Sequence, residues 1–309
     1  MRWLHAGIDR LHVALIGLSR PQIFWHGTTS PSLRAHLDAV RLELPGLSPA
    51  LRYRLTAQTL VGPLEAGYRV RWGPRPHVPV LLYHHGIAEM PYDKSFRGIF
   101  RRHKPLEAHL VAIQAPFHRS WLTVRAGLAT LSHFMAMCAV SIQLMEAVRR
   151  LCVSKGACGS LMTGTSLGGF LALMHHLLVG TADCYAPLLA GPDLSHIMLD
   201  TPFQRFLAPQ ARQQGPAIRR LLDFRQAFQS SDTRRVFPLL ALYDLDMCYP
   251  YHHACYTASR VPVATLRRGH ITGAMAFAAL RDHIRTCLQP LVQVAQSRYH
   301  PEGMIWPQP

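Results

Sequence analysis

One serine between two glycines constrains the fold of this chain more than any other feature. The turn contains Gly164, Ser166 and Gly168. It joins an apolar segment, residues 158–163, to a second apolar segment that begins near Leu167. We expect the first segment to be a buried strand and the second to be a helix. A serine hydroxyl projects from such a turn only if its backbone is strained, and larger side chains at the two glycine positions would collide across the turn. The pattern therefore indicates a nucleophile at the end of a strand.

Short apolar segments recur along the chain and alternate with helical ones. The spacing in the first fifty residues is helical, and a long helical region is expected at about residues 121–150. We expect strands at residues 78–83, 110–113, 158–163, 184–189, 236–243 and 261–266. Strands that alternate with helices form a mostly parallel sheet with helices on both faces, so the fold class is α/β.

The chain contains no internal repeat and no Gly/Ser linker, which favours one main domain. We expect an N-terminal helical extension over residues 1–60, packed on a core domain over residues 61–290, and a C-terminal tail over residues 291–309. Residues 195–235 are too long for a simple crossover and rich in phenylalanine and leucine. We interpret them as a helical insertion, or cap, over the end of the sheet where a ligand binds.

Three segments together resemble the α/β-hydrolase superfamily. The turn around Ser166 is similar to the nucleophile elbow of that family. The segment His84-His85-Gly86-Ile87 is similar to its His-Gly turn, and Gly269-His270 is similar to its final Gly-His loop. The resemblance covers about residues 75–285. It implies an α/β-hydrolase fold with a mostly parallel central sheet, flanked by helices, and a cap before the strand that carries the acid.

The resemblance also implies roles for individual residues. Ser166 would be the nucleophile and His270 the base that takes its proton. The backbone N–H groups of Ile87 and Leu167 would form the oxyanion hole. Because a histidine titrates near neutral pH, activity is expected to rise with pH between about pH 5 and 8.

Three aspartates compete for the role of the acid. The family usually has a glycine three residues before this aspartate and often a proline four residues after it. Asp246 has Pro250 at that offset, although Tyr243 stands at the glycine position. We expect Asp246 to be the acid, with Asp244 and Asp193 as the alternatives.

The expected function is hydrolysis of a carboxylic ester or thioester with an apolar acyl group, through an acyl-enzyme intermediate. A non-catalytic binding protein that has kept the fold is one alternative. The other is a membrane-associated lipase or acyltransferase, in which an amphipathic N-terminal helix makes peripheral contact with the membrane. The sequence does not predict an oligomeric state.

The charge and cysteine content argue against several other classes. The formal net charge is +16, but only Lys94, Lys104 and Lys155 are lysines and the arginines are scattered. Without basic stretches interleaved with aromatics, we expect no nucleic-acid partner. The seven cysteines form no CxxC motif, so we expect a cytoplasmic protein with no cofactor and no metal site.

Several other histidines have weaker claims to a role. The pair His252-His253 with Cys255 superficially resembles a metal cluster, but lacks further ligands at zinc spacing. The pair His175-His176 is expected on the surface of a helix or in its packing. His118 and Arg119 follow a predicted strand in a loop that can approach the site.

Overall fold

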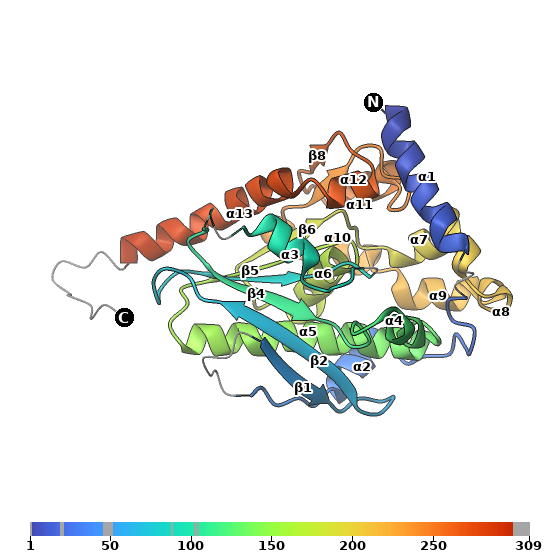
Figure 1. Cartoon of the computed structure of the whole chain (residues 1–309), viewed down its shortest axis with the longest axis horizontal. Helices are drawn as coiled ribbons and strands as arrows, with labels where there is room; N and C mark the ends of the chain where they lie inside the picture. Colours follow the sequence, from blue (N-terminus) through green and yellow to red (C-terminus); the bar gives the residue numbers. More distant parts are fainter. Residues whose placement is uncertain are drawn as a thin grey trace.

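An eight-stranded sheet runs through the part of the chain that the computed structural model describes, which is residues 2–18, 22–45, 52–87, 89–101, 103 and 105–298 (Figure 1). Its strands are β1 Arg52–Ala57, β2 Leu64–Arg71, β3 Val80–His84, β4 His109–Gln114, β5 Ser160–Thr165, β6 Cys184–Leu188, β7 Leu239–Ala241 and β8 Ala264–Leu266. The strand order is β1-β2-β4-β3-β5-β6-β7-β8. The pairs β1–β2 and β2–β4 are antiparallel, and all other neighbours are parallel. The mostly parallel sheet expected from the sequence is confirmed.

The helices follow the strands in the expected alternation. They are α1 Arg2–Leu18, α2 Leu33–Ala39, α3 Lys94–Ile99, α4 Trp121–Gly127, α5 Leu131–Ser154, α6 Leu167–Leu178, α7 Leu194–Asp200, α8 Pro209–Gln213, α9 Gly215–Leu222, α10 Arg225–Gln229, α11 Tyr249–Ala258, α12 His270–Ala274 and α13 Phe277–Arg298. Two short 3-10 helices, Pro202–Phe206 and Thr233–Arg235, complete the set. The long helical region expected at 121–150 is two helices, α4 and α5.

The sheet separates two apolar cores, with α5 on one side of it and α13 on the other (Figure 1). Successive side chains of a strand point to opposite faces, so Met162 of β5 lies in the first core and Leu161 in the second. Every residue of β3, β5 and β6 is buried, because helices cover both faces of these central strands. The buried, rigid ends of these strands are what positions the site.

Helix α5 is long and apolar enough to cross a membrane by length and composition alone. Most of that apolar stretch is buried inside the fold, against α2, α6 and the sheet. Helix α5 is therefore a core helix that belongs to the first apolar core.

The N-terminal boundary predicted at residues 60/61 is wrong. It falls in the turn between β1 and β2, so β1 belongs to the sheet and not to a helical extension. In β1 exposed and buried residues alternate, and arginines occupy exposed positions. This pattern is typical of an edge strand with one solvated face.

The other predicted segments have mixed outcomes. The helical insertion at 195–235 is confirmed, because α7 to α10 lie between β6 and β7. The tail predicted at 291–309 is wrong in its first part, since α13 continues to Arg298, and residues 299–309 lie outside the described residues. Helix α1 packs on the core through one face, while Trp3, Leu4 and Leu11 are exposed on the other. Contact of that outer face with a membrane stays a prediction.

Candidate active site

Ser166 lies in a sharp turn between β5 and α6. Its backbone has φ 56° and ψ −116°, a region that residues other than glycine rarely occupy. The Ser166 N–H donates to the carbonyl of Leu188 at 2.9 Å, which ties the turn to the neighbouring strand β6. A strained backbone persists only where its surroundings hold it, and such residues cluster at functional sites.

The two flanking glycines are required by close backbone contacts. A Cβ atom at Gly168 would lie 2.0 Å from the carbonyl oxygen of His84, and one at Gly164 would lie 2.5 Å from the same atom. These contacts bring the end of β3 directly against the turn. The predicted reason for the glycine spacing therefore agrees with the packing.

Three side chains form a hydrogen-bonded chain at the carboxyl ends of the strands. Oγ of Ser166 lies 3.2 Å from Nε2 of His270, and Nδ1 of His270 donates to Oδ2 of Asp244 at 2.7 Å. Asp244 also accepts from the backbone N–H of Met247 at 2.7 Å, which fixes the orientation of its carboxylate. Such a chain can take a proton from the serine and stabilise the imidazolium that forms.

The sequence predicts that Asp246 is the carboxylate bonded to His270. This prediction is wrong, because the imidazole is bonded to Asp244 instead. Asp246 lies in the same cavity but makes no hydrogen bond to the imidazole in the structure, and its Oδ1 is buried without a partner among the described residues. Burial raises the pKa of Asp246 to about 7. A carboxyl that resists ionisation is poorly suited to stabilise an imidazolium.

Asp246 was expected in place of Asp244 because strand β7 is shorter than the sequence pattern suggests. Strand β7 ends at Ala241, two residues earlier than Tyr243, where the sequence pattern had suggested its end. Asp244 is therefore the third residue after the strand. Small Ala241 stands three residues before Asp244, where the family has glycine, and this agreement was the overlooked clue. The offset from Pro250 was misleading because a turn and the start of α11 intervene.

His270 is surrounded by carboxylates that change its proton affinity. Burial alone would lower its pKa, but Asp244, through charge and its hydrogen bond, and then Asp246 and Asp9 outweigh it. Together they raise the pKa of His270 to about 9, above the pH 5 to 8 window expected from the sequence.

The turn after β3 passes close to Ser166 and places Ile87 in the same cavity as Leu167. A Cβ atom at Gly86 would lie 3.7 Å from Cβ of Ser166. In the described part of the chain, the backbone N–H groups of Ile87 and Leu167 have no protein acceptor. The two expected oxyanion donors are thus brought together with the serine.

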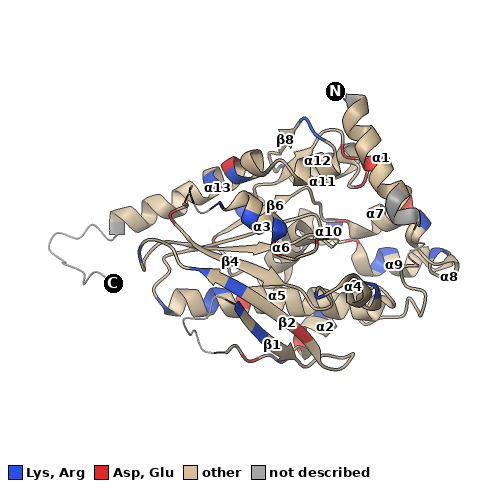
Figure 2. Ribbon diagram, in the orientation of Figure 1, with Lys and Arg blue, Asp and Glu red and all other residues tan. Residues whose placement is uncertain are grey.

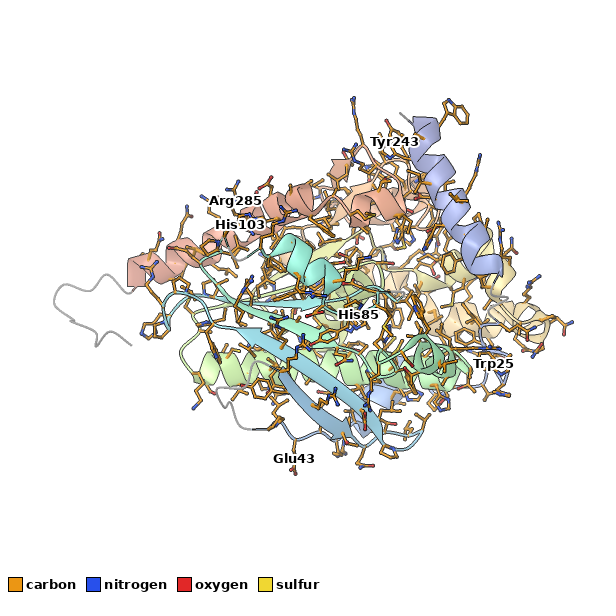
Figure 3. All side chains as sticks on the ribbon, in the orientation of Figure 1. Trp25, Glu43, His85, His103, Tyr243 and Arg285 are labelled. Carbon is orange, nitrogen blue, oxygen red and sulfur yellow. The ribbon has the colours of Figure 1, made fainter. Side chains whose placement is uncertain are left out.

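His85, near the centre of the molecule in Figure 3, holds this turn in place. Its Nε2 accepts from the backbone N–H of Ala115 at 3.1 Å, which leaves the proton on Nδ1. Nδ1 then donates at 2.8 Å to the carbonyl of Gly86, in the peptide group whose N–H belongs to Ile87. Burial lowers the pKa of His85 well below its usual value, so the ring stays neutral.

His118 also contacts the turn, whereas Arg119 does not. Nε2 of His118 lies 2.9 Å from the carbonyl oxygen of Ile87, and its ring packs on His85 at 4.3 Å between centroids. Arg119 forms an ion pair with Glu65 on the surface. Of this pair, only His118 lies at the site.

The remaining candidates from the sequence lie elsewhere. Asp193 is buried at the start of α7, where it accepts from Tyr251 and pairs with Arg225. His175 and His176 are buried packing residues of α6. His252 is buried in α11, and the described residues contain no group of three or more side chains that could hold a metal ion.

A cavity of about 460 Å³ opens beside Ser166 and is lined mostly by apolar side chains. Helix α7 and the 3-10 helix that follows it contribute Leu194, Ile197, Met198 and Phe203. Other parts of the chain contribute Trp121, Leu128, Phe134, Met275 and Phe277. Several polar residues of the cavity were not identified as site residues from the sequence, and two of them are ionisable groups close to the reacting ones. These two are Glu89, whose pKa is raised by burial, and His12 of α1.

Comparison with known proteins extends the structural description. No protein-family model and no curated protein sequence matches the chain. Among solved structures, an S-formylglutathione hydrolase from Agrobacterium tumefaciens is 14% identical with a TM-score of 0.54, over 82% of this chain and 99% of that chain. A thermostable carboxyl esterase from Bacillus coagulans is 11% identical with a TM-score of 0.53, over 80% and 99%. An acylaminoacyl peptidase from Pyrococcus horikoshii is 11% identical with a TM-score of 0.53, over 86% and 44%.

These similarities establish the fold. The chain has the α/β-hydrolase fold, which it shares with esterases and other hydrolases. At such low identity the fold alone is shared, and the activity must be argued from the site.

Proposed function

We propose that the protein is a serine hydrolase that cleaves a carboxylic ester or thioester with an apolar acyl group. The observation that carries the proposal is the hydrogen-bonded chain from Ser166 through His270 to Asp244, at a strained strand-to-helix turn. A nucleophile, its base and an orienting carboxylate within hydrogen-bonding distance are the geometry that acyl transfer requires.

The proposed mechanism has two halves. Oγ of Ser166 attacks the ester carbonyl while Nε2 of His270 takes its proton, and the N–H groups of Ile87 and Leu167 bind the oxyanion. The imidazolium, stabilised by Asp244, gives that proton to the departing alkoxide or thiolate. Water then attacks the acyl-enzyme, with His270 as base, and releases the carboxylic acid and free Ser166.

The cavity supports an apolar acyl group. Its lining is dominated by leucine, isoleucine, methionine and aromatic side chains, and a site of this size encloses a small ligand. Apolar walls also exclude water from the charges that develop during reaction.

Hydrolysis of p-nitrophenyl esters from acetyl to dodecanoyl tests this proposal. We expect turnover by the wild-type protein and a fall of about 10³-fold or more in kcat for Ser166→Ala. Ser154→Ala, which removes an exposed hydroxyl at the end of α5, is the matched control and should be unchanged. Equal turnover by Ser166→Ala and wild type would refute the proposal, and absence of turnover in both would favour a non-catalytic binding protein.

A further inference from the structure

A buried carboxylate of the N-terminal helix reaches the segment that carries His270. Asp9 of α1 has no exposed surface. Its Oδ2 accepts from the backbone N–H of His270 at 2.7 Å, and its Oδ1 accepts from the N–H of Ile271 at 3.1 Å. Oδ2 also lies 3.5 Å from the N–H of Leu245, in the loop that follows Asp244. One side chain thus connects the loop of the acid with the helix of the histidine.

These bonds supply a helix cap from a distant part of the chain. The first N–H groups of a helix have no acceptor within the helix and are usually satisfied by a side chain just before it. At the start of α12 that position is Gly269, which has no side chain. Asp9 takes its place, although it lies 261 residues from His270 in the sequence. The negative charge also lies at the positive end of the helix, where it is stabilising.

Gly269 permits this approach. A Cβ atom there would lie 2.5 Å from Oδ2 of Asp9, so any larger residue would displace the carboxylate. Further contacts hold α1 against the same segment. Nδ1 of His5 lies 3.0 Å from the hydroxyl of Thr272, and His5 stacks on Tyr243, which lies beside α1 in Figure 3.

From these contacts we propose that Asp9 is a positioning residue, which fixes the backbone of His270 so that its imidazole stays aligned between Ser166 and Asp244. The inference rests on the proposed hydrolase function. It means that the site is completed by α1, a helix outside the strands and loops that supply the reacting groups.

Two consequences separate this role from simple support of the fold. First, loss of the cap should misalign the base, which reduces kcat while KM changes little. Second, the ionisable groups that face His270 are Asp244, Asp246, Asp9 and His12. Removal of one carboxylate from this set should lower the pKa of His270, because less negative charge favours the imidazolium.

The test compares Asp9→Asn with wild type. The substitution keeps the shape of the side chain, but turns one acceptor into an amide that opposes a backbone N–H. We expect kcat to fall by about 10- to 100-fold, and the midpoint of the pH profile of kcat/KM to move to lower pH. Asp38→Asn removes an exposed carboxylate of α2 and is the control, for which neither quantity should change.

The pKa of His270 can also be measured without any turnover. NMR of isotope-labelled histidine follows the His270 ring, assigned by the loss of its signal in His270→Gln, and reports the pKa even if no ester is cleaved. A folded Asp9→Asn protein with the pKa of His270 and kcat of wild type would overturn the proposal. If Asp9→Asn does not fold, Gly269→Ala carries the same test, because it displaces the carboxylate from the other side. If the wild-type protein cleaves no ester but Asp9→Asn still lowers the pKa of His270, the result would support the role of Asp9 and refute only the hydrolase function.

Discussion

Two aspartates of one loop differ in what they contact. Asp244 is held by the N–H of Met247 and bonded to His270, whereas Asp246 faces the cavity with one oxygen unpartnered in the described structure. The difference follows from the early end of β7, which turns the third residue after the strand toward the histidine. An acid in this role keeps the imidazole in the tautomer that accepts the serine proton.

We therefore expect Asp244→Asn to lower kcat by about 10⁴-fold, as removal of a triad carboxylate does through the wrong tautomer. Asp246→Asn should lower it by less than about tenfold, because the neutral amide resembles the protonated form that burial already favours. Ester kinetics on both variants, with circular dichroism to verify folding, measure the difference. A larger loss in folded Asp246→Asn than in folded Asp244→Asn would restore the assignment expected from the sequence.

The elements around the site are fixed by backbone contacts that tolerate little change. The start of α6 lies so close to the end of β3 that the Cβ of an alanine at position 168 would overlap a carbonyl oxygen. Backbone atoms cannot move aside as a flexible side chain can. The turn that presents Ser166 therefore depends on the register between these two elements.

Gly168→Ala should destabilise the protein by about 1–3 kcal/mol or more, as overpacking does, and should abolish ester turnover. Gly7→Ala is the matched control, because nothing lies within 4 Å of a Cβ at that position of α1. This control should be stabilised by about 0.5–1 kcal/mol, the usual gain in a helix interior. Urea unfolding measures both, and a Gly168→Ala protein as stable and active as wild type would contradict the account of the turn.

The elements that sequence patterns could predict are those with local causes. The central parallel strands are continuous apolar runs because they are buried on both faces, and the turn around Ser166 carries its own steric reason in its glycines. Strands β1 and β2 were missed because charged residues are interspersed with buried ones at this edge of the sheet. The contact of Asp9 with His270 had no sequence pattern, because it joins segments that only the tertiary fold brings together.

On the scale of the whole molecule, many histidines are buried in neutral form. Burial lowers the pKa of His84 and of His252 to about 3, and that of His176 to about 4. The unfolded chain binds these protons at about pH 6.5. The native state does not bind these protons until the pH is much lower. The free energy of unfolding is therefore highest above about pH 6.5 and falls as the pH is lowered. The chain has a formal net charge of +16 even when its histidines are neutral. Its Lys and Arg side chains lie on several separate elements, as Figure 2 shows.

We expect the free energy of unfolding to fall below pH 6.5, by about 1.4 kcal/mol per pH unit for each such histidine. Asp246 acts in the opposite direction in this range, because its pKa, raised to about 7, favours the native state at low pH, but it is outnumbered. His270 does not change the slope there, because its raised pKa leaves it protonated in both states below about pH 6.5. Urea unfolding at several pH values measures the slope, which His252→Leu should make shallower. His103→Gln, at an exposed position labelled in Figure 3, should leave the slope unchanged. An unfolding free energy independent of pH between about pH 4 and 7 would contradict this account.

The arrangement of Ser166, His270 and Asp244 as a working nucleophile, base and acid is tested most directly by covalent labelling. A fluorophosphonate reacts only with a serine that a neighbouring base activates. The account predicts one adduct per chain, which peptide mass spectrometry places on Ser166, and no adduct in Ser166→Ala or after denaturation. An adduct on another serine, or unchanged labelling of Ser166→Ala, would contradict it.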